Sequence, residues 1–243
     1  MDFPAGSRTK IAFVHVPKTA GTSLTTVLAK GWGRVKIVGV ASEVDAMPDE
    51  EVEDLTLIAG HFFPHQMNRP CFHDYASVTV LRDPFDRLVS AWRFAHERVA
   101  QGDRVGPAMA FAAGVSFSEF AFSSYGAYDR HSQVYNLARE RGMKPQQQPM
   151  ARMLRLAKRL LDGMLVGTAD RLDDFARALF HRFDRGDPPP MPRLNTTADM
   201  PDEVLGLSPA CRAALIEILA PDYELLAYGR GLMEAQLAEQ AVP

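Results

Sequence analysis

Residues 11–28 constrain the fold of this chain more than any other stretch of its sequence. Residues 11–16 are apolar and rich in β-branched side chains, which predicts a short buried strand. Pro17 ends this strand because it has no amide hydrogen to donate to a neighbouring strand. A compact polar turn follows, and then Leu24, Val27 and Leu28 recur at helical spacing. The stretch therefore predicts a strand, a tight turn and a helix in direct succession.

Such a turn suits an anion. Backbone N–H groups at the start of the helix point toward it, and the helix dipole adds positive potential. Lys18 adds a mobile positive charge, and neighbouring Thr and Ser hydroxyls add donors. Lys18 precedes Gly21, however, whereas the lysine of a Walker A loop, GxxxxGK(S/T), follows the second glycine. Taken by itself, the stretch fits two interpretations: an anion site, and a plain strand–helix joint with a surface lysine.

Further strands and helices alternate along the chain. This alternation predicts an α/β fold in which helices flank a mainly parallel central sheet of about five strands. We expect a single domain over residues 1–243, with residues 1–9 flexible and residues 231–243 forming a helical tail. The further strands are expected at 35–40, 55–59, 76–81 and 163–168, and helices at 84–99, 116–122, 130–141, 150–161, 169–183 and from 208 onward, with a helix or loop at 43–54.

Polar clusters follow three of the predicted strands. They occupy residues 17–23, 60–65 and 82–90. Ligands of parallel α/β sheets bind at the carboxyl ends of the strands, so these clusters favour the anion site over the plain joint. In the third cluster, Asp83, Asp86 and Arg87 fit a helix N-cap and surface ion pairs, and contact with a cofactor is the second interpretation.

Composition and charge exclude several classes of protein. The formal net charge of −3 argues against a nucleic-acid partner. The sequence has no apolar signal region at its start and no run of about eighteen apolar residues, so we expect a cytoplasmic protein without a membrane segment. Cys71 and Cys211 lack a CxxC partner and could pair with each other in space, but we expect buried free thiols and no metal site. The sequence does not indicate an oligomeric state.

Two motifs together resemble the signature of the carbohydrate sulfotransferases. Residues 13–23 read FVHVPKTAGTS, and residues 80–92 read VLRDPFDRLVSAW. Within this family, the two motifs resemble in particular the branch that includes the heparan sulfate 2-O- and chondroitin-type enzymes and bacterial homologues. Weaker matches follow in the family's order at residues 60–62, 164–168 and 194–197. The resemblance implies a P-loop-like, three-layer fold.

The resemblance also implies a donor and the residues that hold it. These enzymes use 3′-phosphoadenosine 5′-phosphosulfate (PAPS) and release adenosine 3′,5′-bisphosphate. Lys18 would contact the oxygen that bridges the sulfate and the 5′-phosphate. Arg82 and Ser90 would bind the 3′-phosphate. The 5′-phosphosulfate loop would comprise Pro17, Lys18, Thr19, Ala20, Gly21, Thr22 and Ser23, and the nucleotide would also be approached by Asn195, Thr196 and Thr197.

The chemistry expected of such a site is simple. Sulfuryl transfer, like phosphoryl transfer, depends mainly on positioning and on neutralising charge at the leaving oxygen, and a lysine there requires no metal ion. A histidine suits removal of the proton from the acceptor hydroxyl. His61 directly follows a strand and matches a family histidine, so it is the expected base, with His65 second; some members use a carboxylate. His15 is expected to be packed within the first strand.

The acceptor is expected to be a hydroxyl-bearing, carbohydrate-like molecule. Gln133 and the basic helix around Arg152, Arg155 and Arg159 are candidates for binding it. Two other functions stay open: a P-loop-type nucleotide kinase, and an inactive module that binds a sulfonucleotide or a carbohydrate. The missing Walker A order disfavours the kinase, and the intact Lys18 and His61 disfavour the inactive module.

Overall fold

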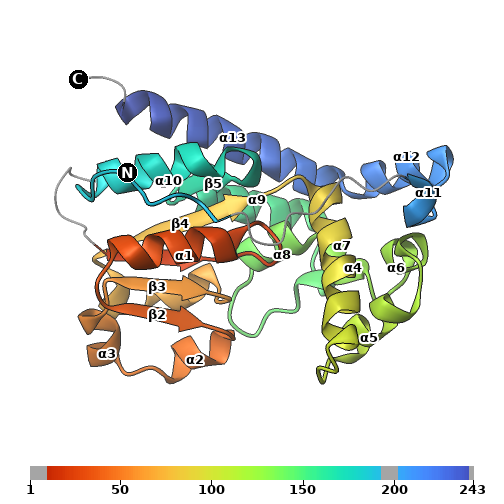
Figure 1. Ribbon diagram of the computed structural model, residues 1–243, viewed down its shortest axis with the longest axis horizontal. Coiled ribbons are helices and arrows are strands. Elements are labelled where there is room, and N and C mark those ends of the chain that lie inside the picture. Colours follow the sequence, from red (N-terminus) through yellow and green to blue (C-terminus); the bar gives the residue numbers. More distant parts are fainter. Residues whose placement is uncertain (1–9, 193–201, 241–243) are drawn as a thin grey trace.

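A five-stranded parallel sheet forms the centre of the molecule (Figure 1). The computed structural model describes residues 10–192 and 202–240. The strand order is β2-β3-β1-β4-β5, so β1 lies between β3 and β4. This sheet confirms the predicted α/β class. The strands span Lys10–Val14 (β1), Val35–Val38 (β2), Leu57–Gly60 (β3), Tyr75–Leu81 (β4) and Leu165–Thr168 (β5).

Helices cover both faces of the sheet, because side chains of each strand alternate between two apolar cores. Ile11 and Phe13 pack under α1 (Gly21–Gly31) and α10 (Leu172–Arg182). Ala12 and Val14 pack in the opposite core, which also holds side chains from the following helices: α2 (Ala41–Ala46), α3 (Asp49–Asp54), α8 (Ser132–Leu137) and α9 (Met150–Leu161). The three-layer arrangement is therefore as expected, and residues 43–54 are mainly helical.

The last helix, α13 (Ala220–Gln240), packs against the edge strand β5. Met233 is buried in the core. The Gln236 side chain accepts a hydrogen bond from the Val166 N–H (3.1 Å) and donates one to the Met164 carbonyl (2.9 Å). It thereby satisfies backbone groups that an edge strand would otherwise leave unpaired.

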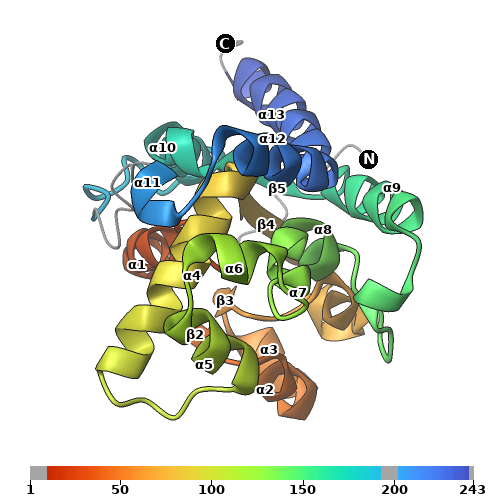
Figure 2. The same cartoon turned by 90° about the vertical axis from the view of Figure 1, so that its right-hand side faces the viewer.

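A group of helices stands beside the carboxyl ends of the strands (Figure 2). Its apolar cluster includes Phe85, Leu88 and Phe117. The Trp92 indole packs against this cluster and donates to the Val115 carbonyl (3.0 Å). The predictions missed α5, because its small apolar residues show no helical period. The helices are α4 (Pro84–Ala100), α5 (Pro107–Gly114), α6 (Phe117–Phe122), α7 (Ala127–Arg130), α11 (Asp202–Leu205) and α12 (Pro209–Ile218).

Short 3₁₀ turns complete the secondary structure: η1 (Pro64–Asn68), η2 (Pro70–Phe72), η3 (Pro145–Gln147) and η4 (Ala169–Arg171). Both cysteines are free thiols; Cys71 is buried as expected, whereas Cys211 is half-buried. Across residues 10–192 and 202–240, every helix is too short or too polar to cross a membrane.

Candidate active site

A cavity of about 350 Å³ opens at the carboxyl ends of β3, β1 and β4. Because β1 lies between the other two strands, the three polar clusters that follow these strands are brought side by side. Helices α4, α5 and α6 supply the opposite wall. The polar residues of the lining are His15, Lys18, Thr22, Ser23, His61, Arg82, Ser90 and Asp129.

The turn between β1 and α1 has a strained backbone. Lys18 has a φ of 70° and Ala20 a φ of 66°, both in the left-handed region that side chains disfavour by about 1–2 kcal/mol per residue. Ala20 occupies the N-cap position and offers no side-chain oxygen to the first N–H groups of α1. These N–H groups are therefore suited to a bound anion.

Within this turn, Thr19 differs from its neighbours. Its side chain is fully buried, and its hydroxyl donates to the Val16 carbonyl (2.9 Å). Thr22 and Ser23 line the cavity, whereas Thr19 is absent from the described lining. The Thr19 hydroxyl therefore stabilises the turn.

The Lys18 side chain crosses the cavity to α4, where its ammonium nitrogen lies 4.0 Å from the centroid of the Phe94 ring. Burial lowers the pKa of Lys18, and the nearby Arg82 and Arg87 lower it further, while Glu97 partly opposes them. Burial likewise lowers the pKa of Arg82. Two partly desolvated cations thus share one cavity, and an entering anion would relieve their repulsion.

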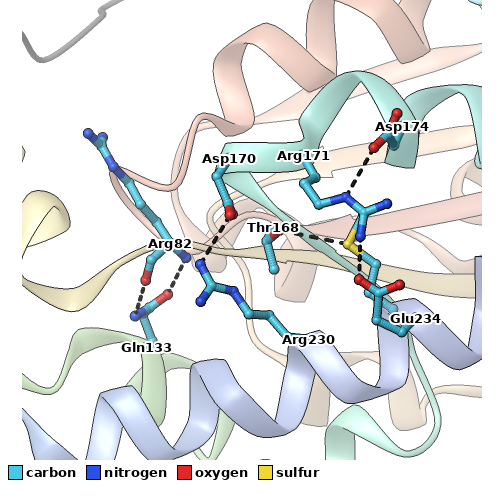
Figure 3. Close-up of polar contacts among 9 residues, drawn as sticks. Arg82, Gln133, Thr168, Asp170, Arg171, Asp174, Arg230 and Glu234 are labelled. Atoms are coloured by element: carbon cyan, nitrogen blue, oxygen red, sulfur yellow. Dashed lines mark hydrogen bonds and ion pairs between the residues drawn. The ribbon is translucent and has the colours of Figure 1, made fainter.

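A side-chain amide holds the backbone of Arg82 in place (Figure 3). Gln133 accepts a hydrogen bond from the Arg82 N–H (2.8 Å) and donates one to the Arg82 carbonyl (2.9 Å). This leaves the guanidinium free to extend away from Gln133, and its Nη1 donates to the Lys18 carbonyl (3.3 Å). Gln133, one of the candidates for binding the acceptor, is fully buried and lies outside the described cavity lining. It is instead a positioning residue for Arg82.

A buried carboxylate supports this amide in turn. Asp222 of α13 accepts hydrogen bonds from the backbone N–H groups of Gln133 (3.2 Å) and Val134 (3.4 Å). Burial raises the pKa of Asp222 to about 7, although Arg87 and these hydrogen bonds oppose the rise. The chain of contacts therefore runs from α13 through α8 to Arg82.

Arg87 does not lie at the surface as the sequence suggested. It is fully buried, and it contacts Asp129 of α7 through a hydrogen bond to the carbonyl and an ion pair to the carboxylate (3.6 Å). It is not part of a surface ion pair. The predicted N-cap is confirmed, since the Asp83 carboxylate accepts from the Asp86 N–H (3.0 Å).

Replacing Gln133 should lower both the stability of the fold and the affinity of the cavity for nucleotide. In Gln133→Ala, two buried backbone groups of Arg82 lose their partners, which should cost about 1–3 kcal/mol of unfolding free energy. The affinity for adenosine 3′,5′-bisphosphate should fall about tenfold (about 1.4 kcal/mol), because Arg82 is no longer held. Urea unfolding and calorimetry measure the two effects. The exposed Gln146→Ala is the control, and equal effects of both substitutions would contradict this role.

His61 emerges directly from the end of β3. A Cβ on Gly60, whose φ is +147°, would lie 2.0 Å from the Val38 carbonyl oxygen, so only glycine allows this approach to β2. The His61 N–H then donates to the same carbonyl (3.1 Å). The His61 Nδ1 lies 3.0 Å from the His15 carbonyl oxygen, which can only accept. Nδ1 therefore carries the proton, and Nε2 keeps the lone pair that a general base needs.

His15 lies just past the end of β1, not within it as expected, and it lines the cavity. Its ring stacks on that of His61, with centroids 4.5 Å apart. Burial, with repulsion from His61 and Lys18, lowers the pKa of His15 to about 3. His15 is therefore a neutral support for His61 at physiological pH.

The absence of a side chain at Gly21 leaves space for the His15 ring. A Cβ added to Gly21 would lie 2.0 Å from Cδ2 of the His15 ring. We expect Gly21→Ala to displace the ring and to lower the unfolding free energy by about 1–3 kcal/mol, as overpacking does. The control is Gly33→Ala, because a Cβ at Gly33 meets no atom within 4 Å. Chemical denaturation measures the unfolding free energy of both variants. An equally small change in the two would contradict close packing of Gly21 against the His15 ring.

Similarity to known proteins identifies the family. The family model described as the sulfotransferase family matches residues 2–229 of the 243. This chain belongs to the sulfotransferase family. Sulfotransferases move a sulfuryl group from a sulfonate donor to an acceptor, which for this family suggests a hydroxyl. The search of curated proteins finds no match.

Several residues that the sequence suggested lie elsewhere in this sulfotransferase. The His65 Nδ1 lies 2.9 Å from the Arg139 carbonyl oxygen, and His65 is outside the described cavity lining. The basic residues of α9 also lie outside this lining: Arg152, Arg155 and Arg159. Asn195, Thr196 and Thr197 fall outside the described residues. Within the described ranges, no group of three or more His, Cys, Asp or Glu side chains could hold a metal ion.

The predictions missed the apolar wall of the cavity. Phe94 lies one helical turn beyond Ser90 on α4, so helical spacing alone could have placed it on the same face. Met109 and Ala112 of α5 carried no such signal.

Proposed function

We propose that this sulfotransferase moves a sulfuryl group from PAPS to a hydroxyl of a carbohydrate or another small acceptor by direct in-line transfer. The main support is the single cavity that gathers Lys18, His61, Arg82 and Ser90 around the start of α1. We also propose that the chain belongs to the branch of the family that includes the heparan sulfate 2-O- and chondroitin-type enzymes and bacterial homologues.

The residues present fit the donor. The first N–H groups of α1 suit its 5′-phosphate, and two cations with incompletely balanced charge suit its anionic groups. Arg82 and Ser90 would bind the 3′-phosphate, and Ser90 is buried where it lines the cavity. When bound, PAPS supplies an activated sulfuryl group.

Lys18 and His61 divide the remaining chemistry. The Lys18 ammonium would neutralise charge that develops on the leaving oxygen. The His61 Nε2 would accept the proton of the attacking hydroxyl, since Nδ1 already donates to the His15 carbonyl. His65 stays a second choice for this base, at a position outside the described cavity lining.

Thermal denaturation with nucleotides tests the donor. Adenosine 3′,5′-bisphosphate at a hundred times its Kd should stabilise the protein by about 2.7 kcal/mol. This corresponds to a rise in Tm of about 5–10 °C for a chain of this length. ATP with Mg²⁺ should raise Tm much less. The opposite order would favour a P-loop-type kinase, and tight bisphosphate binding without turnover on any acceptor would favour an inactive module.

Arg82 provides a second arm of this experiment. We expect Arg82→Met to abolish most of the Tm shift that the bisphosphate causes, because the 3′-phosphate loses its charged partner. The exposed Arg141→Met removes a positive charge elsewhere and should leave the shift unchanged. An undiminished shift in Arg82→Met would contradict the proposed 3′-phosphate site.

A further inference from the structure

We infer that the acceptor is an uncharged alcohol with an apolar body about the size of one or two rings. The inference rests on the proposed function and narrows its acceptor class. It follows from how polar and apolar side chains are distributed around the cavity, from the few charges in its lining, and from its volume.

The cavity has two chemically different walls. Polar side chains come mainly from the strand ends, the first turn of α1 and the second turn of α4. The opposite wall, formed by α4, α5 and α6, is apolar. Its lining residues are Ala91, Phe94, Ala95, Ala108, Met109, Ala112 and Phe120.

Phe94 places the apolar wall beside the reacting groups. Its ring centroid lies 4.0 Å from the Lys18 ammonium nitrogen, which is the group proposed to act on the leaving oxygen. An acceptor whose hydroxyl reaches this point therefore has its body against α4 and α5. A sugar there would bury hydroxyl groups against alanine, methionine and phenylalanine side chains, and unpaired buried hydroxyls are costly.

The charges in the lining also disfavour an anionic glycan. Among the described lining residues, the lysine and arginine cations are Lys18 and Arg82, both proposed to bind the donor. Asp129 is the acidic residue of the lining, and its carboxylate already pairs with the buried Arg87. Among the lining residues that the structure describes, a polyanionic acceptor would thus meet a carboxylate and no cation left over from donor binding.

The volume of the cavity also favours a compact acceptor. A cavity of about 350 Å³ is near the lower end of the range for small-molecule sites. Part of it would hold the phosphosulfate and the 3′-phosphate of the donor. What remains suits a compact ring system better than an extended chain of sugars.

Acceptor competition tests the inference. With PAPS as donor, we expect kcat/KM for 2-naphthol to exceed that for methyl β-glucoside and for an unsulfated chondroitin disaccharide by at least tenfold. With adenosine 3′,5′-bisphosphate bound, 2-naphthol should also bind the protein, as followed by its fluorescence. A preference for either sugar would overturn the inference but leave the proposed function intact. Failure of the bisphosphate to bind would overturn both.

Met109 supplies the discriminating variant. Met109→Lys puts a charge on the half-buried apolar wall, so the KM for 2-naphthol should rise at least tenfold while the Tm shift caused by the bisphosphate stays unchanged. Ala110→Lys is the matched control, since Ala110 is exposed on the same helix and outside the described lining. Unchanged 2-naphthol binding and KM in Met109→Lys would overturn the inference.

Discussion

Lys18→Ala should lower kcat for sulfuryl transfer by about 10³-fold, equivalent to about 4 kcal/mol of transition-state stabilisation. The reason is that the Lys18 ammonium is the charged group placed across the cavity between the strained turn and the Phe94 ring. Steady-state kinetics with saturating PAPS measures the loss. Folding should be intact, because the substitution removes a side chain that lies in the cavity and not in the apolar cores.

Lys30→Ala is the matched control for this prediction. Lys30 lies in the last turn of α1, is exposed, and is remote from the start of the helix. Its removal changes the net charge by the same amount as Lys18→Ala. If Lys18→Ala and Lys30→Ala have similar kcat values, then the ammonium does not act on the leaving group.

His61→Asn should reduce kcat by between about 10² and 10⁴-fold, the usual contribution of a general base. An asparagine amide can still donate to the His15 carbonyl, as the His61 Nδ1 does, but it offers no basic nitrogen in place of Nε2. The affinity for adenosine 3′,5′-bisphosphate should stay within about twofold of the wild-type value (about 0.4 kcal/mol). Turnover over a range of pH and calorimetry measure both quantities.

Two other histidines show whether this effect is specific. His73→Asn is the matched control, because the His73 Nδ1 lies 3.0 Å from the Pro70 carbonyl oxygen in a comparable arrangement on the surface. His65→Asn tests the second choice for the base. A loss of turnover in His65→Asn together with near-normal rates in His61→Asn would reverse the assignment.

Much of the fold could be predicted because its signals are local. The apolar run before Pro17 and the helical spacing after Ser23 predicted β1 and α1, with β1 ending two residues earlier than expected. The edge position of β2 also followed from its short run. Residues 150–161 matched α9 at both ends, since Pro149 precedes the helix and Gly163 follows it. Strand ends and helix starts thus located the polar clusters.

What the sequence concealed depends on contacts between distant residues. Gln133 reaches Arg82 from 51 positions away, and nothing in its neighbourhood signals that its amide holds a strand end. The stacking of His15 on His61 likewise joins residues that come together only when β1 pairs with β3. The apolar wall from α5 has no periodic pattern, so its role follows only from the packing of α5 against α4.

Transfer of a radiolabelled sulfuryl group from PAPS tests the central proposal most directly. The purified protein is incubated with labelled PAPS and a panel of alcohols and sugars, and the products are identified by mass. We predict a stable sulfate ester formed together with an equal amount of adenosine 3′,5′-bisphosphate, and almost none with Lys18→Ala. Release of the bisphosphate without a labelled ester, or equal transfer by wild type and Lys18→Ala, would contradict the proposal.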